Sequence, residues 1–132
     1  MAIIKRLMPL ILAILFILSS CNKTVGGMIP VSEQDNGKTV ELLTGDKLIV
    51  ELEGNPTTGY LWEVESGEGK ELKQEGEAEF NPASSLVGSG GKVSLQFKAV
   101  TPGKVVLRLV YHRPWEQDIP PEKTYEIEVI IK

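Results

Sequence analysis

Residues 92–99 read Lys-Val-Ser-Leu-Gln-Phe-Lys-Ala and alternate polar with apolar side chains without interruption. A period of two is typical of a strand with one buried face, whereas a helix repeats its apolar face every three to four residues. We therefore predict a strand here with Val93, Leu95 and Phe97 facing inward. The remaining side chains, Lys92, Ser94, Gln96 and Lys98, would face outward.

The same alternation continues on both sides of this stretch and predicts seven strands. Their ranges are 40–43, 47–51, 60–64, 71–80, 92–99, 104–111 and 123–131. No segment from residue 38 onward shows a helical stripe longer than two turns, so the fold class is all-β. Strands about ten residues apart favour an immunoglobulin-like antiparallel β-sandwich, with the polar 71–80 strand at an edge and Trp62 in the core.

The N-terminal residues have a different character from the rest of the chain. Lys5 and Arg6 precede an apolar run that ends on Leu-Ser-Ser-Cys at residues 18–21, a pattern typical of a secretory signal. Leu-Ser-Ser-Cys resembles the bacterial lipobox, and Cys21 is the only cysteine among 132 residues. We expect a signal peptide over 1–20, a lipid on Cys21 that anchors an exported protein to the cell envelope, a flexible tether over 21–37, and one domain over 38–132. An ordinary signal peptide with an incidental thiol is the alternative.

The charge of the chain limits its partners. Removing residues 1–20 takes away Lys5 and Arg6 and no acidic residue, which would change the net charge from -4 to about -6. A negative domain argues against nucleic acid, and against anionic lipid held by the domain itself. No cofactor or metal site is expected, and the charged edge strand favours a monomer.

The turns between the predicted strands fall into two classes. Three are short and built from ordinary turn residues, at 44–46, 65–69 and 100–103. The other three are longer and alternate with them along the chain. If consecutive strands alternate in direction, the three longer loops lie at one end of the sandwich, where this architecture presents binding surfaces.

Each longer loop carries a short motif. Asn55-Pro56-Thr57-Thr58-Gly59-Tyr60 predicts a stiff wedge with two hydroxyls at its tip, although a structural turn would explain it equally well. Gly88-Ser89-Gly90-Gly91 is either a bulged turn or a backbone that a partner approaches closely. Arg113-Pro114-Trp115 favours an exposed anchor, because Trp and Arg are enriched among interface hot spots.

Together, in this order and spacing, the three motifs make the mature domain resemble the chagasin family of inhibitors of papain-type cysteine peptidases. The resemblance implies an immunoglobulin-like sandwich whose three loops enter the active-site cleft of the peptidase. It implies that residues 55–59 insert at the catalytic Cys-His pair, with Thr57 nearest the chemistry. It also implies backbone contacts from 88–91 on the non-primed side, and Trp115 packing on the primed side beside Arg113.

Two other classes of function remain open from the residues themselves. A surface-anchored binding or adhesion module with no peptidase target would share the fold and the loops. An enzyme is harder to assemble, because His112 is the only histidine and Cys21 the only thiol.

Overall fold

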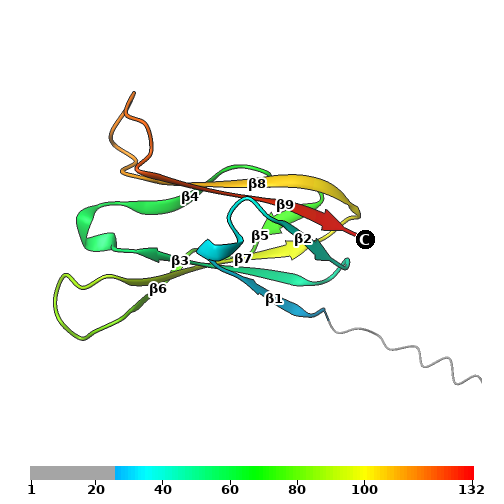
Figure 1. The fold of residues 1–132 in the computed structure, drawn as a ribbon, viewed down its shortest axis with the longest axis horizontal. Helices are drawn as coiled ribbons and strands as arrows, with labels where there is room; N and C mark the ends of the chain where they lie inside the picture. The colour runs from blue at the N-terminus through cyan, green and yellow to red at the C-terminus, as the bar shows by residue number, and fades with distance from the viewer. Residues whose placement is uncertain (1–25) are drawn as a thin grey trace, which may run out of the picture.

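Two β-sheets pack face to face in the computed structural model, which describes residues 26–132 (Figure 1). One sheet has the strand order β1-β3-β7-β5, with β6 also paired to β7, and the other has the order β2-β9-β8-β4. The strands are β1 (Met28–Val31), β2 (Thr39–Leu42), β3 (Lys47–Gly54), β4 (Leu61–Ser66), β5 (Leu72–Gln74), β6 (Glu79–Pro82), β7 (Gly91–Ala99), β8 (Gly103–His112) and β9 (Lys123–Ile131). Two three-residue 3-10 helices, η1 (Glu33–Asp35) and η2 (Pro56–Thr58), are the remaining elements. No helix of these residues is long and apolar enough to cross a membrane.

The predicted alternation describes the core accurately. Val93, Leu95 and Phe97 of β7 are at most 8% exposed. The side chains predicted to face inward on the other long strands are also buried, except Val105, which is half-buried. The buried ones are Leu48, Val50, Leu52, Leu107, Leu109, Tyr125, Ile127, Val129 and Ile131. Trp62 is buried as predicted and donates its indole N–H to the carbonyl oxygen of Glu53 at 3.0 Å. The all-β sandwich is thus confirmed.

The pairing departs from a wholly antiparallel sandwich at two strands. β1 runs parallel to β3, and β2 runs parallel to β9. The predicted 71–80 strand is divided into β5 and β6, which both pair with β7. Gly76, at φ 70°, lies between them, and the register shifts by two residues across the break. Residues 26–132 therefore form nine strands in two mixed sheets rather than the seven strands predicted.

The expected tether over 21–37 needs correction where the structure describes it. Met28–Val31 pairs with β3 along four residues, and Val31 is 5% exposed. Beyond β1, the Tyr125 hydroxyl donates to the carbonyl oxygen of Ser32 at 2.8 Å, and the Gly37 N–H donates to that of Glu126. These contacts make residues 28–37 part of the sandwich. The signal peptide over 1–20 and the lipid on Cys21 lie outside the described residues.

Both edges of each sheet are irregular. The edge strand β1 contains Pro30, which has no N–H, and β2 has only four residues. The edge strand β4 pairs with β8, and the register of this pairing shifts between Val64 and Ser66. The fourth edge is divided into β5 and β6 and ends at Pro82.

We expect Tyr125→Phe to lower the free energy of unfolding by about 1 kcal/mol at pH 7, because the hydrogen bond to Ser32 is lost. Burial, and then the nearby Asp35 and Glu33, raise the pKa of Tyr125 in the folded protein. The stability that protonated Tyr125 contributes is complete below about pH 10 and falls as the pH rises above it. Urea unfolding at pH 7 and pH 11 should show a smaller alkaline loss in the variant. An equal loss in both proteins would contradict this account.

Candidate functional site

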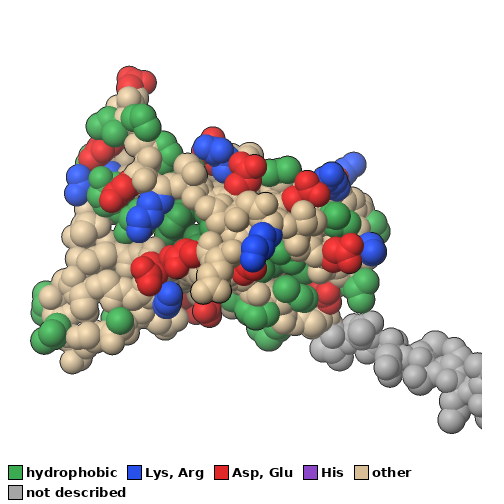
Figure 2. Space-filling view, in the orientation of Figure 1, with side chains coloured by type: hydrophobic (Ala, Val, Ile, Leu, Met, Phe, Trp, Pro, Cys, Tyr) green, Lys and Arg blue, Asp and Glu red, His purple; other side chains and the backbone are tan. Residues whose placement is uncertain are grey.

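The three motif-bearing loops lie at one end of the sandwich, as the alternation of turns predicts (Figure 1). They are loop 55–60 between β3 and β4, loop 83–90 between β6 and β7, and loop 113–122 between β8 and β9. Figure 2 shows this end as two projections with hydrophobic side chains on both and a recessed region between them. We call it the loop end, and we call the opposite end, with the β2–β3 and β7–β8 turns, the base.

Loop 55–60 is a rigid turn held by its own polar groups. The Asn55 side chain accepts a hydrogen bond from the Thr57 N–H at 3.1 Å and caps the 3-10 helix η2. Pro56 begins this helix, and Gly59 ends it at φ 82°, in the left-handed region. Residues 56–58 are exposed at the tip. The wedge predicted from the sequence is present.

The two threonines lie at the tip as predicted, and their hydroxyls form hydrogen bonds within the turn. The Thr57 hydroxyl donates to the Asn55 side-chain oxygen at 2.5 Å, and the Thr58 hydroxyl donates to the Asn55 carbonyl oxygen at 2.6 Å. Both satisfy acceptors inside the turn, because a tight helical turn brings residues two and three positions apart within reach. The hydroxyls therefore stiffen the wedge.

Tyr111 ties this loop to the core. Its ring is 5% exposed and lies 5.2 Å from the Tyr60 ring and 5.0 Å from the Trp62 ring. Its hydroxyl accepts a hydrogen bond from the Asn55 N–H at 2.9 Å. From the sequence, Tyr111 is predicted only as the end of a strand, because a single tyrosine there gives no sign of its partner 56 residues away. The wedge thus rests on a buried aromatic stack.

Arg113 joins loop 113–122 to loop 55–60. Its Nε donates to the Thr58 carbonyl oxygen at 3.0 Å, and its guanidinium lies 4.4 Å above the Tyr60 ring. Its Nη1 donates to Glu116 at 3.1 Å, and this hydrogen bond raises the pKa of Arg113 above its ordinary value. Arg113 is therefore a positioning residue for both loops as well as a candidate contact.

Trp115 lies over loop 55–60 and remains 66% exposed. Its six-membered ring is so close to Gly59 that a Cβ added there would overlap it. The edge of the ring can lie against this residue only because glycine has no side chain. Trp115 is exposed as predicted, and its position depends on Gly59, while its role as an anchor stays a prediction.

Loop 83–90 is held on the other side of the wedge. The Asn55 side-chain N–H donates to the Gly88 carbonyl oxygen at 3.0 Å. Ser89 turns inward, with its hydroxyl 2.8 Å from the Leu86 carbonyl oxygen. Gly90 packs beside the Gly54 carbonyl, and Gly91 lies so close to Asn81 and Pro82 that an added Cβ would overlap their backbone. Gly90 and Gly91 thus allow close packing within the protein, a role that the sequence did not predict, and the predicted approach of a partner to this backbone stays a prediction.

Three exposed apolar side chains at the loop end are not among the residues predicted from the sequence. Leu86 and Val87, at the tip of loop 83–90, are 75% and 104% exposed, and Ile119 of loop 113–122 is 58% exposed. The available signal was two adjacent aliphatic residues between Ser-Ser and Gly, a poor place for core residues. They add an apolar contact on each side of the wedge.

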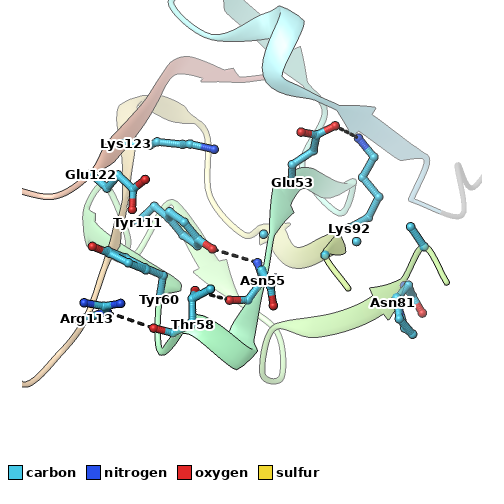
Figure 3. Close-up of a pocket in the computed structure, with 15 residues that line it drawn as sticks. Glu53, Asn55, Thr58, Tyr60, Asn81, Lys92, Tyr111, Arg113, Glu122 and Lys123 are labelled. Atoms are coloured by element: carbon cyan, nitrogen blue, oxygen red, sulfur yellow. Dashed lines mark hydrogen bonds and ion pairs between the residues drawn. The ribbon is translucent and has the colours of Figure 1, made fainter. Parts of the chain in front are cut away.

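An open groove of about 770 Å³ lies among the loops (Figure 3). Tyr60 and Tyr111 lie on one side of it, with Arg113 beside them, and Asn81 and Lys92 lie on the other. Asn55 stands between the two sides. The wedge is thus flanked by an aromatic, cationic wall and by a polar wall.

This end is suited to binding and offers little for catalysis. His112 lies near it, but its Nε2 is 2.7 Å from Glu63 on the outer face of the sheet. In the described part of the chain, no three His, Cys, Asp or Glu side chains are grouped to hold a metal ion. What the arrangement provides is three mutually braced loops that present backbone and apolar side chains.

Comparisons with known proteins agree with this geometry. The family model described as chagasin family peptidase inhibitor I42 matches residues 41–129. Amoebiasin-1 of Entamoeba histolytica is 32% identical over 102 residues, which cover 77% of this chain and 98% of amoebiasin-1.

Two solved structures share the fold. The crystal structure of the cysteine protease inhibitor EhICP2 from Entamoeba histolytica has a TM-score of 0.71 at 24% identity, covering 80% of this chain and 96% of that one. The structure of PbICP-C in complex with falcipain-2 has a TM-score of 0.53 at 20% identity, covering 81% of this chain and 100% of that one.

Proposed function

This chain belongs to the chagasin family of peptidase inhibitors, and on that premise we propose that its loop end blocks the active-site cleft of a papain-like cysteine peptidase. The family consists of protein inhibitors and not of enzymes. The observation that carries the proposal is the bracing of loop 55–60 from both sides, by Gly88 and by Arg113 with Trp115. Rigid loops lose little conformational entropy on binding, so contacts made by them are retained as affinity.

Each loop has a separate role in this proposal. Loop 55–60 enters the cleft at the catalytic Cys-His pair, with Thr57 at the tip. Residues 88–91 follow the non-primed side through backbone contacts, and Leu86 and Val87 extend that contact with apolar surface. Trp115 packs on the primed side, where its exposed ring face becomes buried.

Inhibition of papain by the soluble protein tests this proposal. Residues 26–132 contain both sheets and the whole described core, so a chain that begins at Asn22 keeps every contact reported above. We expect it to inhibit papain reversibly in a titration with a fluorogenic peptide substrate. Full peptidase activity at micromolar inhibitor, for papain and related peptidases, would contradict the proposal and favour a binding module without a peptidase target.

We expect Leu86→Ala to raise the inhibition constant for papain by about 10-fold, because burying an aliphatic side chain contributes roughly 1.5–3 kcal/mol and alanine retains part of it. Leu43→Ala is the matched control, because Leu43 is 51% exposed at the base. The control should inhibit like the unmodified protein. Equal inhibition by the unmodified protein, Leu86→Ala and Leu43→Ala would show that Leu86 does not contact the peptidase.

We also propose that the protein is exported and anchored to the cell envelope by a lipid on Cys21. The support is the signal-like sequence before Cys21 and the absence of any other cysteine from the chain. Metabolic labelling with a fatty acid should mark the full chain in a bacterial host and should be lost in Cys21→Ser. Unchanged labelling of the variant would contradict this proposal without affecting the inhibitor proposal.

A further inference from the structure

A row of lysines crosses one sheet at the base. The strand registers place Lys98 of β7 directly opposite Lys47 of β3 and also opposite Lys73 of β5. Met28 of β1 is the partner of Lys47 and continues the row. Because residues opposite each other in a register share a face of the sheet, these four side chains lie together on the outer face.

This row is not explained by the stability of the sheet. Lys73 and Lys98 are exposed, and within residues 26–132 no carboxylate lies within salt-bridge distance of either. Lys47 alone has a partner, Glu75 at 3.3 Å. Like charges directly opposite each other destabilise a sheet, so the arrangement carries a cost that an anionic partner would offset.

Exposed apolar side chains accompany the lysines at the base. Met28, Leu43 and Val100 are 62%, 51% and 39% exposed. The Gly45 N–H donates to the Ala99 carbonyl oxygen at 2.8 Å, which brings the turns that carry Leu43 and Val100 side by side. Cationic and apolar groups together are the composition of surfaces that lie on anionic membranes.

The negative net charge is a sum over the whole chain and does not show how charge is distributed along this face. Where the same face reaches the loop end, Glu53 stands opposite Lys92, with 3.5 Å between carboxylate and ammonium. Among acidic residues at the base, Asp46 is 8% exposed and accepts hydrogen bonds from two backbone N–H groups, those of Gly27 and Leu43. Two acidic side chains near the row are paired with lysines: Glu71 lies 3.9 Å from Lys70, and Glu75 lies 3.3 Å from Lys47. The expectation that the domain does not hold anionic lipid rests on the net charge of the whole chain, which does not describe this row of lysines.

The described chain also enters the fold at the base. Gly27 accepts from the Lys47 N–H at 2.8 Å, and Gly26 packs against the Gly45 carbonyl so closely that an added Cβ would overlap it. We propose that the base is a docking surface for an anionic lipid bilayer, formed by Lys47, Lys73, Lys98 and the exposed Met28, Leu43 and Val100. This proposal concerns a different surface from the inhibitory one and depends on neither the peptidase nor the lipid on Cys21.

Docking by the base directs the inhibitory loops away from the membrane. β8 spans ten residues from the base to the loop end, which corresponds to roughly 33 Å. The membrane, the chain entry and the loop end then lie in order along the long axis of the sandwich (Figure 1). A peptidase approaching from the solvent would meet the wedge directly.

Vesicle binding by the chain that begins at Asn22, and so lacks Cys21, tests the proposal. We expect it to cosediment with vesicles of equal parts phosphatidylglycerol and phosphatidylcholine at low salt, and not with phosphatidylcholine alone. Lys73→Gln with Lys98→Gln should weaken this binding about 25-fold, since each lysine near an anionic surface contributes a factor of about five. This variant relieves a like-charge contact and is expected to fold.

The matched control, Lys92→Gln with Lys123→Gln, makes the same change in charge at the loop end and should bind vesicles like the unmodified chain.

Orientation gives a second measurement. In vesicles with brominated acyl chains, we expect the indole added by Val100→Trp to be quenched, while emission from the native tryptophans of the unmodified chain stays unchanged. The proposal is overturned by absence of binding to anionic vesicles, by equal binding to phosphatidylcholine, or by equal losses in the two lysine variants. Quenching of native tryptophan emission in the unmodified chain would also overturn it, because Trp115 lies at the loop end.

Discussion

Gly59→Ala is expected to weaken the inhibition of papain by about 100-fold while leaving the sandwich folded. Alanine at φ 82° costs about 1–2 kcal/mol of backbone strain, and its Cβ would occupy the position of the Trp115 ring. The ring must then leave the wedge, so the change alters two of the three contact loops. Progress curves with papain measure the inhibition constant, and urea unfolding shows that the fold persists.

Gly37→Ala is the matched control for this prediction. Gly37 has the same φ of 82°, but an added Cβ there meets nothing within 4 Å. Both variants should lose a similar free energy of unfolding from backbone strain, and only Gly59→Ala should lose inhibition. If the two variants inhibit equally, the contact between Gly59 and Trp115 has no part in binding.

Trp115→Ala is expected to raise the inhibition constant by about 30-fold or more. Truncating a tryptophan at an interface hot spot often costs about 2 kcal/mol or more, and Trp115 has most of its surface available for burial. The free energy of unfolding should change little, because the ring is 66% exposed in the free protein. The measurement is again a titration of papain, with unfolding as a parallel assay.

Val106→Ala provides the control for truncating an exposed apolar side chain. Val106 is 45% exposed and lies in β8, away from the loop end. It should inhibit papain like the unmodified protein. Inhibition by Trp115→Ala at the unmodified level would remove the anchor role from Trp115 while leaving the wedge as the inhibitory element.

Periodicity predicted the long central strands well and the short edge strands poorly. Along β7 and β9 the buried face repeats over nine residues, so the alternation is unambiguous. β1 has four residues, only one of which is buried, and it is recognisable as a strand only from its pairing with β3. The break between β5 and β6 follows from a register shift against β7, which no local pattern encodes.

The candidate site was predictable in position and less so in its internal contacts. Counting alternate turns placed the three loops at one end, because strand direction alone decides where a turn lies. The contact between Gly59 and Trp115 joins residues 56 positions apart, and it depends on a conformation that only the folded loops define. The threonine hydroxyls turned inward for a similar reason, since Asn55 presents acceptors within the turn.

The irregular sheet edges bear on how densely such a protein can be crowded at a surface. Each of the four sheet edges is interrupted. The edge at β1 contains a proline and the edge at β2 has only four residues. The edge at β4 has a register shift, and the fourth edge is divided into β5 and β6. Edge-to-edge pairing between molecules needs a continuous run of free N–H and C=O groups, and none of these edges offers a long one. We therefore expect many copies to lie side by side on a membrane without fusing their sheets into larger aggregates.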